Sequence, residues 1–289
     1  MKHGIYYAYW EKEWAADYMP YIEKVAGLGF DVLEIGGAAL PAMSKAQLRQ
    51  LAHASKSYNV EITTGYGPIA QHDVGNISSR KTALEWYKKT FEAMAEIGST
   101  VIGGALYSHW PVDYSKPICK EEDRKYAVEG MVELAELAKP YNIQLNMESL
   151  NRFEGYLINT ARECVDFVNE VNCDNVWVML DTFHMNIEED DIGQAILLAG
   201  KRLGHFHTGE CNRLVPGKGR MPWREIGQAL RQINYNKCVV MEPFVNVGGQ
   251  VGADIKIWRT MVDNNNVAAL DKDAYDALLF QRYMLDGNI

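Results

Sequence analysis

Four side chains that can bind a metal ion occur at regular intervals in the second half of the chain. They are Glu148, Asp181, His207 and Glu242, and each lies at or next to the end of an apolar run. The runs read IQLNMES, NVWVMLD, RLGHFHT and KCVVMEP, and successive members of the set are 33, 26 and 35 residues apart. Each separation matches one strand-plus-helix unit, so four consecutive parallel strands would bring all four side chains to one edge of a sheet.

Three carboxylates and one imidazole, without a thiolate, form an oxygen-rich donor set. Such a set suits a hard or borderline divalent ion, Mn²⁺, Mg²⁺ or Co²⁺, and argues against structural zinc. A metal ion held there can polarise a carbonyl group and stabilise an enediolate. A single carboxylate at a strand end often just caps a loop or pairs with Lys or Arg, but the shared register of all four favours a metal site.

The elements that must position these residues are eight apolar, strand-like runs that alternate with stretches of helical period. The runs begin at Gly4, Asp31, Val60, Thr100, Ile143, Asn175, Arg202 and Lys237. They predict an α/β fold, a (β/α)₈ TIM barrel over residues 1–289 as a single catalytic domain, with a C-terminal helical extension from about Asp271 to Leu285. The alternative is an open doubly wound sheet, but no G-x-G-x-x-G turn follows an early strand.

Alternation along the strands places further polar side chains inside the barrel. If Glu148 faces inward, so do Asn146 and Gln144, and His205 shares the inward face of His207. Buried polar groups must bind something or one another. We therefore expect His205 to support His207 rather than to bind the metal itself.

Short local motifs mark the starts of three helices. Ser44 with Gln47 and Thr160 with Glu163 match the capping box, in which side-chain and backbone groups three residues apart bond to each other. Pro222 is expected at the first position of a further helix.

Composition argues against several classes of protein. The chain holds 38 acidic and 29 basic residues, for a formal net charge of −9, which argues against nucleic acid and against an anionic membrane surface as partners. No apolar stretch reaches the ~20 residues that span a bilayer, and the first residues, MKHGIYYAYWEKEW, lack the features of a signal peptide. The five cysteines form no C-x-x-C pair, so we expect a reduced, cytoplasmic protein.

The motifs ESLNRFEGYLINT, VMLDTFHMNIEED, GHFHTGECNRLVPGKGR and VMEPFVNVGGQVGADIKIWR resemble the D-tagatose 3-epimerase family, most closely its D-psicose (D-allulose) 3-epimerases. The resemblance covers the chain from Met1 to about Leu285. It implies a xylose-isomerase-like barrel that inverts C3 of free ketohexoses through a metal-bound cis-enediolate, interconverting D-fructose with D-psicose and D-tagatose with D-sorbose. It also implies one Mn²⁺ or Co²⁺ per subunit, with Mg²⁺ as a further candidate, and a homodimer or homotetramer.

Carried over by motif, the resemblance assigns roles to ten residues. The metal ligands would be Glu148, Asp181, His207 and Glu242, and Glu148 and Glu242 would also be the acid/base pair. The substrate contacts would be Glu154, His184 and Arg213 at the O1–O3 end of the sugar, and Tyr6, Trp110 and Phe244 along the pocket.

Three residues depart from the family pattern without removing a ligand. Ser149 replaces an aliphatic residue, Trp177 replaces a lysine, and His109 replaces a tyrosine before Trp110. Of the three, His109 is the one expected to affect substrate preference, because it is next to a pocket residue.

Other functions fit parts of the pattern. A related barrel aldose–ketose isomerase needs a base on only one face of the sugar. A sugar-phosphate epimerase would use the GGQVG loop from Gly248, which has no Lys or Arg before Lys256. A barrel endonuclease with several zinc ions would need more histidines and a basic face. A non-catalytic sugar-binding barrel has no need of two opposed carboxylates, so Glu148 with Glu242 favours an enzyme.

Overall fold

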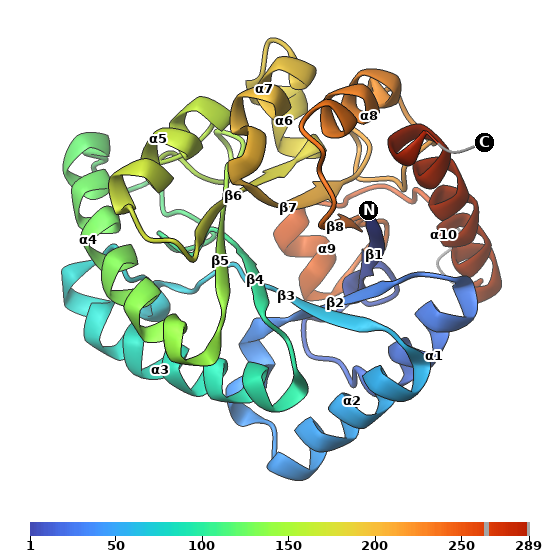
Figure 1. Ribbon diagram of the computed structural model, residues 1–289, viewed down its shortest axis with the longest axis horizontal. Coiled ribbons are helices and arrows are strands. Elements are labelled where there is room, and N and C mark those ends of the chain that lie inside the picture. The colour runs from blue at the N-terminus through green and yellow to red at the C-terminus, as the bar shows by residue number, and fades with distance from the viewer. Residues whose placement is uncertain (263–265, 288–289) are drawn as a thin grey trace.

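The computed structural model describes residues 1–262 and 266–287, and its centre is a closed barrel of eight parallel strands (Figure 1). The strands are β1 (Lys2–Tyr6), β2 (Val32–Gly36), β3 (Glu61–Gly65), β4 (Val101–Gly104), β5 (Gln144–Glu148), β6 (Val176–Asp181), β7 (Leu203–Thr208) and β8 (Cys238–Met241). Each strand pairs with the next in sequence, and β8 pairs with β1. The predicted TIM barrel is therefore confirmed, and an open sheet is excluded.

Helices surround the barrel in a ring, and the short helix that follows β8 lies inside this ring (Figure 1). They are α1 (Met19–Leu28), α2 (Lys45–Tyr58), α3 (Ile77–Ile97), α4 (Lys120–Ala138), α5 (Ala161–Val171), α6 (Thr182–Glu188), α7 (Ile192–Ala199), α8 (Trp223–Gln232), α9 (Gly249–Ile255) and α10 (Val267–Gln281). Short 3₁₀ turns occupy Tyr7–Tyr9, Gly37–Ala42, Ala70–His72, Lys139–Tyr141 and Gly200–Arg202, and a π-helical turn occupies Arg282–Asp286.

The local motifs predict the helix starts to within a few residues. Ser44 forms the complete capping box with Gln47 before α2. Thr160 caps α5 as expected, but the Glu163 carboxylate accepts from the Asn159 backbone N–H at 2.7 Å, so that box is only half formed. Pro222 lies one residue before α8 rather than inside it, because α8 begins at Trp223.

The strand boundaries and the C-terminal helix also differ slightly from the prediction. Strands β2 to β8 each begin one residue after the predicted start, whereas β1 begins at Lys2 and ends at Tyr6. The C-terminal helix begins at Val267 because the Asn266 side chain accepts from the Ala269 N–H and caps it there.

The inward face of the barrel contains polar side chains that bond to one another, as the alternation predicts. Gln144 donates to the Asn146 side-chain oxygen at 2.7 Å, and Asn146 donates to the Ile102 carbonyl. The pairing of β6 with β7 skips Gly204, where a Cβ atom would lie 2.1 Å from that Asn146 oxygen. This irregularity brings Asp181 and His207 into register as direct neighbours.

The C-terminal helix is tied to the barrel through a buried chain of hydrogen bonds. Thr208, next to His207, donates to the Gln281 side chain at 2.7 Å. The Gln281 amide bonds to His3 Nδ1 at 2.9 Å, and His3 Nε2 bonds to Asp286 at 2.9 Å. Gln281 is fully buried, so it links β7, β1 and the end of the chain.

The structure also bears on two expectations from composition. No helix in the described ranges is long and apolar enough to cross a membrane. All five cysteines are free.

We predict that Gln281→Leu lowers the free energy of unfolding by about 1–3 kcal/mol. The change leaves the Thr208 hydroxyl and the His3 imidazole without their buried partner, which is the usual cost of an unsatisfied buried group. Urea denaturation measures the effect. The matched control is Gln232→Leu at an exposed position, where we expect a change within about 0.5 kcal/mol. Equal stability of the two variants would contradict the role given to Gln281.

Candidate active site and metal centre

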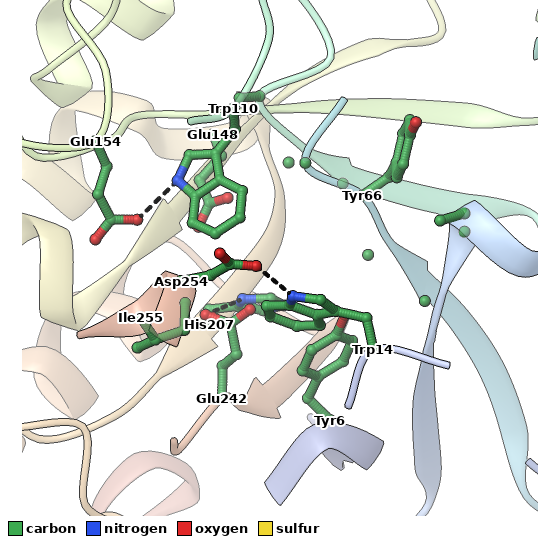
Figure 2. Close-up of a pocket in the computed structure, with 18 of the residues that line it drawn as sticks. Tyr6, Trp14, Tyr66, Trp110, Glu148, Glu154, His207, Glu242, Asp254 and Ile255 are labelled. Atoms are coloured by element: carbon green, nitrogen blue, oxygen red, sulfur yellow. Dashed lines mark hydrogen bonds and ion pairs between the residues drawn. The ribbon is translucent and has the colours of Figure 1, made fainter. Parts of the chain in front are cut away.

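A cavity of about 300 Å³ opens at the carboxyl ends of the strands (Figure 2). Nine of the ten predicted site residues line it, namely Tyr6, Trp110, Glu148, Glu154, His184, His207, Arg213, Glu242 and Phe244. The tenth, Asp181, is fully buried and bonds to the lining residue Arg213 at 3.0 Å. The structure therefore brings all ten residues to one place.

Three of the four predicted metal ligands form a compact group. Glu148, Asp181 and His207 each offer one ligand atom, and these atoms all lie within 4.8 Å of one another. Glu242 follows β8, and its Oε2 lies 3.5 Å from His207 Nδ1. Strands β5, β6, β7 and β8 thus each contribute one donor to the same corner of the cavity.

Glu34 on β2 is a buried carboxylate that the sequence reasoning missed. Its Oε1 bonds to His207 Nε2 at 2.6 Å, its Oε2 bonds to His205 Nε2 at 2.8 Å, and Thr63 donates to it as well. Burial opposes its ionisation, but the two imidazoles outweigh burial and hold the pKa of Glu34 well below its usual value. The available signal was a charged residue inside the apolar run VLEIG.

The bond to Glu34 determines which nitrogen of His207 faces the cavity. A carboxylate accepts, so Nε2 carries a proton and donates to Glu34, and Nδ1 is directed toward Glu242. Glu34 and Glu242 also raise the pKa of His207 against the effect of its burial. A proton and a metal ion would therefore compete for Nδ1. His205 bonds to the other oxygen of the same carboxylate, and Glu34, His205 and His207 also lie close enough together to be a possible group of metal donors.

The donor set fits a divalent cation. His207 Nδ1 and Glu148 Oε1 are both buried without a hydrogen-bond partner, which is costly unless something else bonds to them. Burial, together with the nearby Glu242 and Asp181 carboxylates, raises the pKa of Glu148 well above its usual value. A cation among these oxygens would relieve both the repulsion and the missing contacts. Oxygen donors with one imidazole favour Mn²⁺, Co²⁺ or Mg²⁺.

Arg213 is the positive charge that the protein itself supplies. Its Nη1 lies 3.0 Å from both Asp181 Oδ2 and Glu242 Oε2, and these carboxylates raise its pKa although it is buried. The guanidinium carbon lies 3.7 Å from the centre of the Phe183 ring and 5.3 Å from that of Phe244. Such cation–π contacts hold the guanidinium plane in one orientation.

Glu210 organises the loop that carries Arg213, and the sequence reasoning missed it too. It is fully buried and accepts from the Gly217 N–H at 2.7 Å, the Met221 N–H at 3.1 Å and Trp223 Nε1 at 2.8 Å. These bonds fold the loop back on itself, and Arg213 has a left-handed φ of 64° within it. Nothing in the sequence near Glu210 predicts these long-range partners.

His184, Glu154 and Trp110 form one hydrogen-bonded network with Asn151. His184 Nδ1 accepts from the Asn151 backbone N–H at 3.1 Å, so its proton lies on Nε2, 3.8 Å from both Glu148 and Asp181. Burial lowers the pKa of His184 below its usual value. Glu154 accepts from Asn151 at 3.0 Å and from Trp110 Nε1 at 3.1 Å (Figure 2).

Glu154 is held in its charged form by this network. Burial alone would raise the pKa of Glu154, but His184 and Arg213 and the two hydrogen bonds lower it below its usual value. A charged carboxylate at this position can accept hydrogen bonds from a hydroxylated ligand.

The opposite wall of the cavity is built from backbone and aromatic rings. Six glycines at or just after the ends of β2, β3 and β4 line the cavity, namely Gly36, Gly37, Gly65, Gly67, Gly103 and Gly104. Gly104 has a φ of 129°, and a Cβ atom there would lie 2.1 Å from the Tyr66 carbonyl oxygen. The Trp14 indole donates to Asp254 at 2.7 Å, and the Tyr7 and Tyr18 hydroxyls donate to backbone carbonyls. These groups are already bonded within the protein.

Comparison with known proteins agrees with this geometry. Residues 22–261 match the family model described as xylose isomerase-like TIM barrel. The D-psicose 3-epimerase of Ruminiclostridium cellulolyticum is 52% identical over 288 residues, which are 99% of this chain and 98% of the relative. That of Agrobacterium fabrum is 50% identical, covering 99% of this chain and 100% of the relative. A crystal structure of D-psicose 3-epimerase with D-tagatose from Clostridium cellulolyticum has a TM-score of 0.97 at 53% identity, covering 99% of both chains.

The identity extends over nearly the whole chain, and the family-model match covers most of the barrel. The chain therefore belongs to the xylose isomerase-like TIM barrels and, within them, to the D-psicose 3-epimerases, and it is an isomerase that acts as a ketose 3-epimerase.

Proposed function

We propose that the enzyme interconverts D-fructose and D-psicose (D-allulose), and also D-tagatose and D-sorbose, by proton transfer at C3 with one divalent metal ion per subunit. The observation that carries the proposal is the placement of two glutamates from β5 and β8 around Asp181 and His207. Figure 2 shows Glu148 and Glu242 reaching the cavity from different directions, with His207 between them.

The proposed metal ligands are Glu148, Asp181, His207 and Glu242. Support comes from their proximity and from the two buried donor atoms without partners. When bound, Mn²⁺, Co²⁺ or Mg²⁺ would act as a Lewis acid that makes the C3 proton more acidic.

Glu148 and Glu242 are the proposed acid/base pair. One glutamate takes the C3 proton from one face of the sugar, and this leaves a cis-enediolate across C2 and C3. The other glutamate delivers a proton to C3 from the opposite face, so the configuration inverts and the proton count balances.

The remaining site residues would hold the reacting end of the sugar. His184 presents an Nε2–H donor, Arg213 presents guanidinium donors, and Glu154 presents a charged acceptor for hydroxyl groups near O1 to O3. Tyr6, Trp110 and Phe244 would pack against the carbon skeleton.

The cavity favours free sugars over sugar phosphates. Arg213 is the one Arg or Lys among the described lining residues, and it already pairs with Asp181, Glu242 and Glu154. Asp254 also lines the cavity and adds a further negative charge. A phosphate group in this cavity would therefore meet carboxylates and no unpaired cation among the described lining residues.

The same proposal includes three expectations that rest on the family resemblance and composition. The chain acts as one barrel domain over residues 1–289, assembles as a homodimer or homotetramer, and functions in the cytoplasm without nucleic acid or membrane partners.

We predict that Asp181→Ala loses tightly bound Mn²⁺, epimerase activity and the stabilisation that the metal gives. A ligand that binds only the native state raises its stability by mass action, so the added metal should no longer raise Tm. Metal analysis and thermal unfolding with and without Mn²⁺ measure both effects. Asp190→Ala, at an exposed position, should behave like the wild type. One full equivalent of tightly bound Mn²⁺ in Asp181→Ala would overturn the assignment.

We predict that Glu148→Gln and Glu242→Gln each reduce the epimerisation rate by about 10²–10⁴-fold, the usual loss when a general acid or base is removed. Glutamine keeps an oxygen for the metal but cannot take a proton. A single remaining base can still exchange the C3 hydrogen of one epimer with solvent without inverting it. Glu85→Gln on the exposed face of α3 is the matched control. Near wild-type turnover in either site variant, with metal bound, would rule out the two-base mechanism.

We predict that Glu34→Gln weakens Mn²⁺ binding by about 10–100-fold, the usual effect of losing the group that orients a ligating histidine. An amide cannot accept from His205 and His207 as the carboxylate does. Calorimetric titration gives the Kd. The control Thr63→Val removes only the hydroxyl bond to the same carboxylate and should change the Kd much less. An unchanged Kd in Glu34→Gln would show that the carboxylate does not orient His207.

A further inference from the structure

The loop over residues 105–119, between β4 and α4, carries Trp110 against the cavity. The Trp110 backbone N–H donates to the Pro68 carbonyl at 2.6 Å, and its indole Nε1 donates to Glu154 at 3.1 Å. The ring also meets Trp14 edge-on, with ring centres 6.3 Å apart. Trp110 is therefore both a wall of the cavity and the group that orients one Glu154 oxygen (Figure 2).

His109 attaches this loop to the start of α3. Its Nδ1 lies 2.7 Å from Asp73 Oδ2, and the carboxylate is buried. Asp73 is itself held in place, because its Oδ1 accepts from the Gly75 N–H at 2.8 Å and from the Asn76 N–H at 3.2 Å. Asp73 therefore presents its second oxygen in a defined direction, and His109 donates its Nδ1 proton to it.

The His109 side chain borders open space on this side of the loop. A second cavity, of about 370 Å³, is lined by Asp73, Ser108 and His109, together with Tyr107, Asp123 and Tyr156. A side chain beside an open cavity lacks contact atoms on one side. The hydrogen bond to Asp73 therefore restrains the His109 side chain itself, whereas the preceding Tyr107 is held by burial and by its hydroxyl bond to the Glu148 carbonyl.

We propose that Asp73 and His109 are a positioning pair that sets the affinity for the sugar by holding Trp110 and, through its indole, Glu154. The inference rests on the proposed function, because it takes Trp110 and Glu154 as sugar contacts. Neither Asp73 nor His109 lines the main cavity, so they act only through the loop. The metal donors are on β5 to β8 or directly follow β8, and the contact of this loop with them is the bond from the Tyr107 hydroxyl to the Glu148 backbone carbonyl, which the His109 side chain does not make.

The test is the steady-state kinetics of D-psicose epimerisation with saturating Mn²⁺. His109→Ala should raise KM about five- to tenfold and leave kcat within about twofold, the pattern of lost binding that is equal in ground and transition states. His109→Asn places an amide N–H close to the position of Nδ1 and should restore KM. The matched control is His53→Ala at an exposed position on α2, which should change neither constant, and the Kd for Mn²⁺ should stay constant throughout.

Combining His109→Ala with Trp110→Phe tests whether His109 affects KM through the Trp110 indole. That variant keeps a ring but loses the indole donor to Glu154, so His109→Ala should add little to it in the double variant. Fully additive effects, or a fall in kcat at constant KM, would overturn the positioning role. An unchanged KM in His109→Ala, with raised KM in Trp110→Phe and Glu154→Gln, would also overturn it but leave the proposed function intact. No change in any of these variants would refute the proposed sugar site itself.

Discussion

Negative charge gathered at the carboxyl end of the barrel is the constraint on which the rest of the site depends. Six carboxylates lie in or directly behind one cavity, namely Glu34, Glu148, Glu154, Asp181, Glu242 and Asp254. Like charges at such distances repel strongly where water is excluded. Two kinds of group offset this repulsion. Arg213 pairs with three of the carboxylates, and two imidazoles bond to Glu34. Glu148 keeps an oxygen without a partner, and a divalent ion is the natural counter-charge there.

Apart from Glu34 on β2 and Asp254 on α9, this charge lies on one side of the barrel mouth. Strands β5 to β8 provide the donor groups and proton carriers, whereas β2 to β4 end in glycines, and aromatic rings complete that side of the wall. An epimerase needs firm control of C2 and C3 and much less control of the rest of the sugar. A wall of backbone and rings offers packing without specific hydrogen bonds. The separation of the charged side of the barrel mouth from its apolar side therefore agrees with a reaction that is confined to one end of the substrate.

The sequence predicts well the residues that face the cavity, and it predicts poorly the buried residues that bond to them. Barrel topology places every strand end at the same mouth, so Glu148, Asp181, His207 and Glu242 could be grouped from their spacing alone. The partner of His207 could not be found in this way, because Glu34 meets it only when β2 and β7 face each other across the closed barrel. The same holds for Asp73 with His109, which belong to different connections. The C-terminal helix begins a few residues before the predicted start because Asn266 caps it at Val267.

The central claim is that the two glutamates act on C3, and isotope exchange tests it most directly. The wild-type enzyme is incubated with D-fructose and Mn²⁺ in D₂O, and the position of deuterium in both sugars is read by NMR. The account predicts deuterium at C3 of D-psicose and of recovered D-fructose, and none at C1. Deuterium at C1 would indicate an aldose–ketose isomerase working through a 1,2-enediol. Epimerisation without any solvent deuterium would contradict proton transfer by carboxylates that exchange with water.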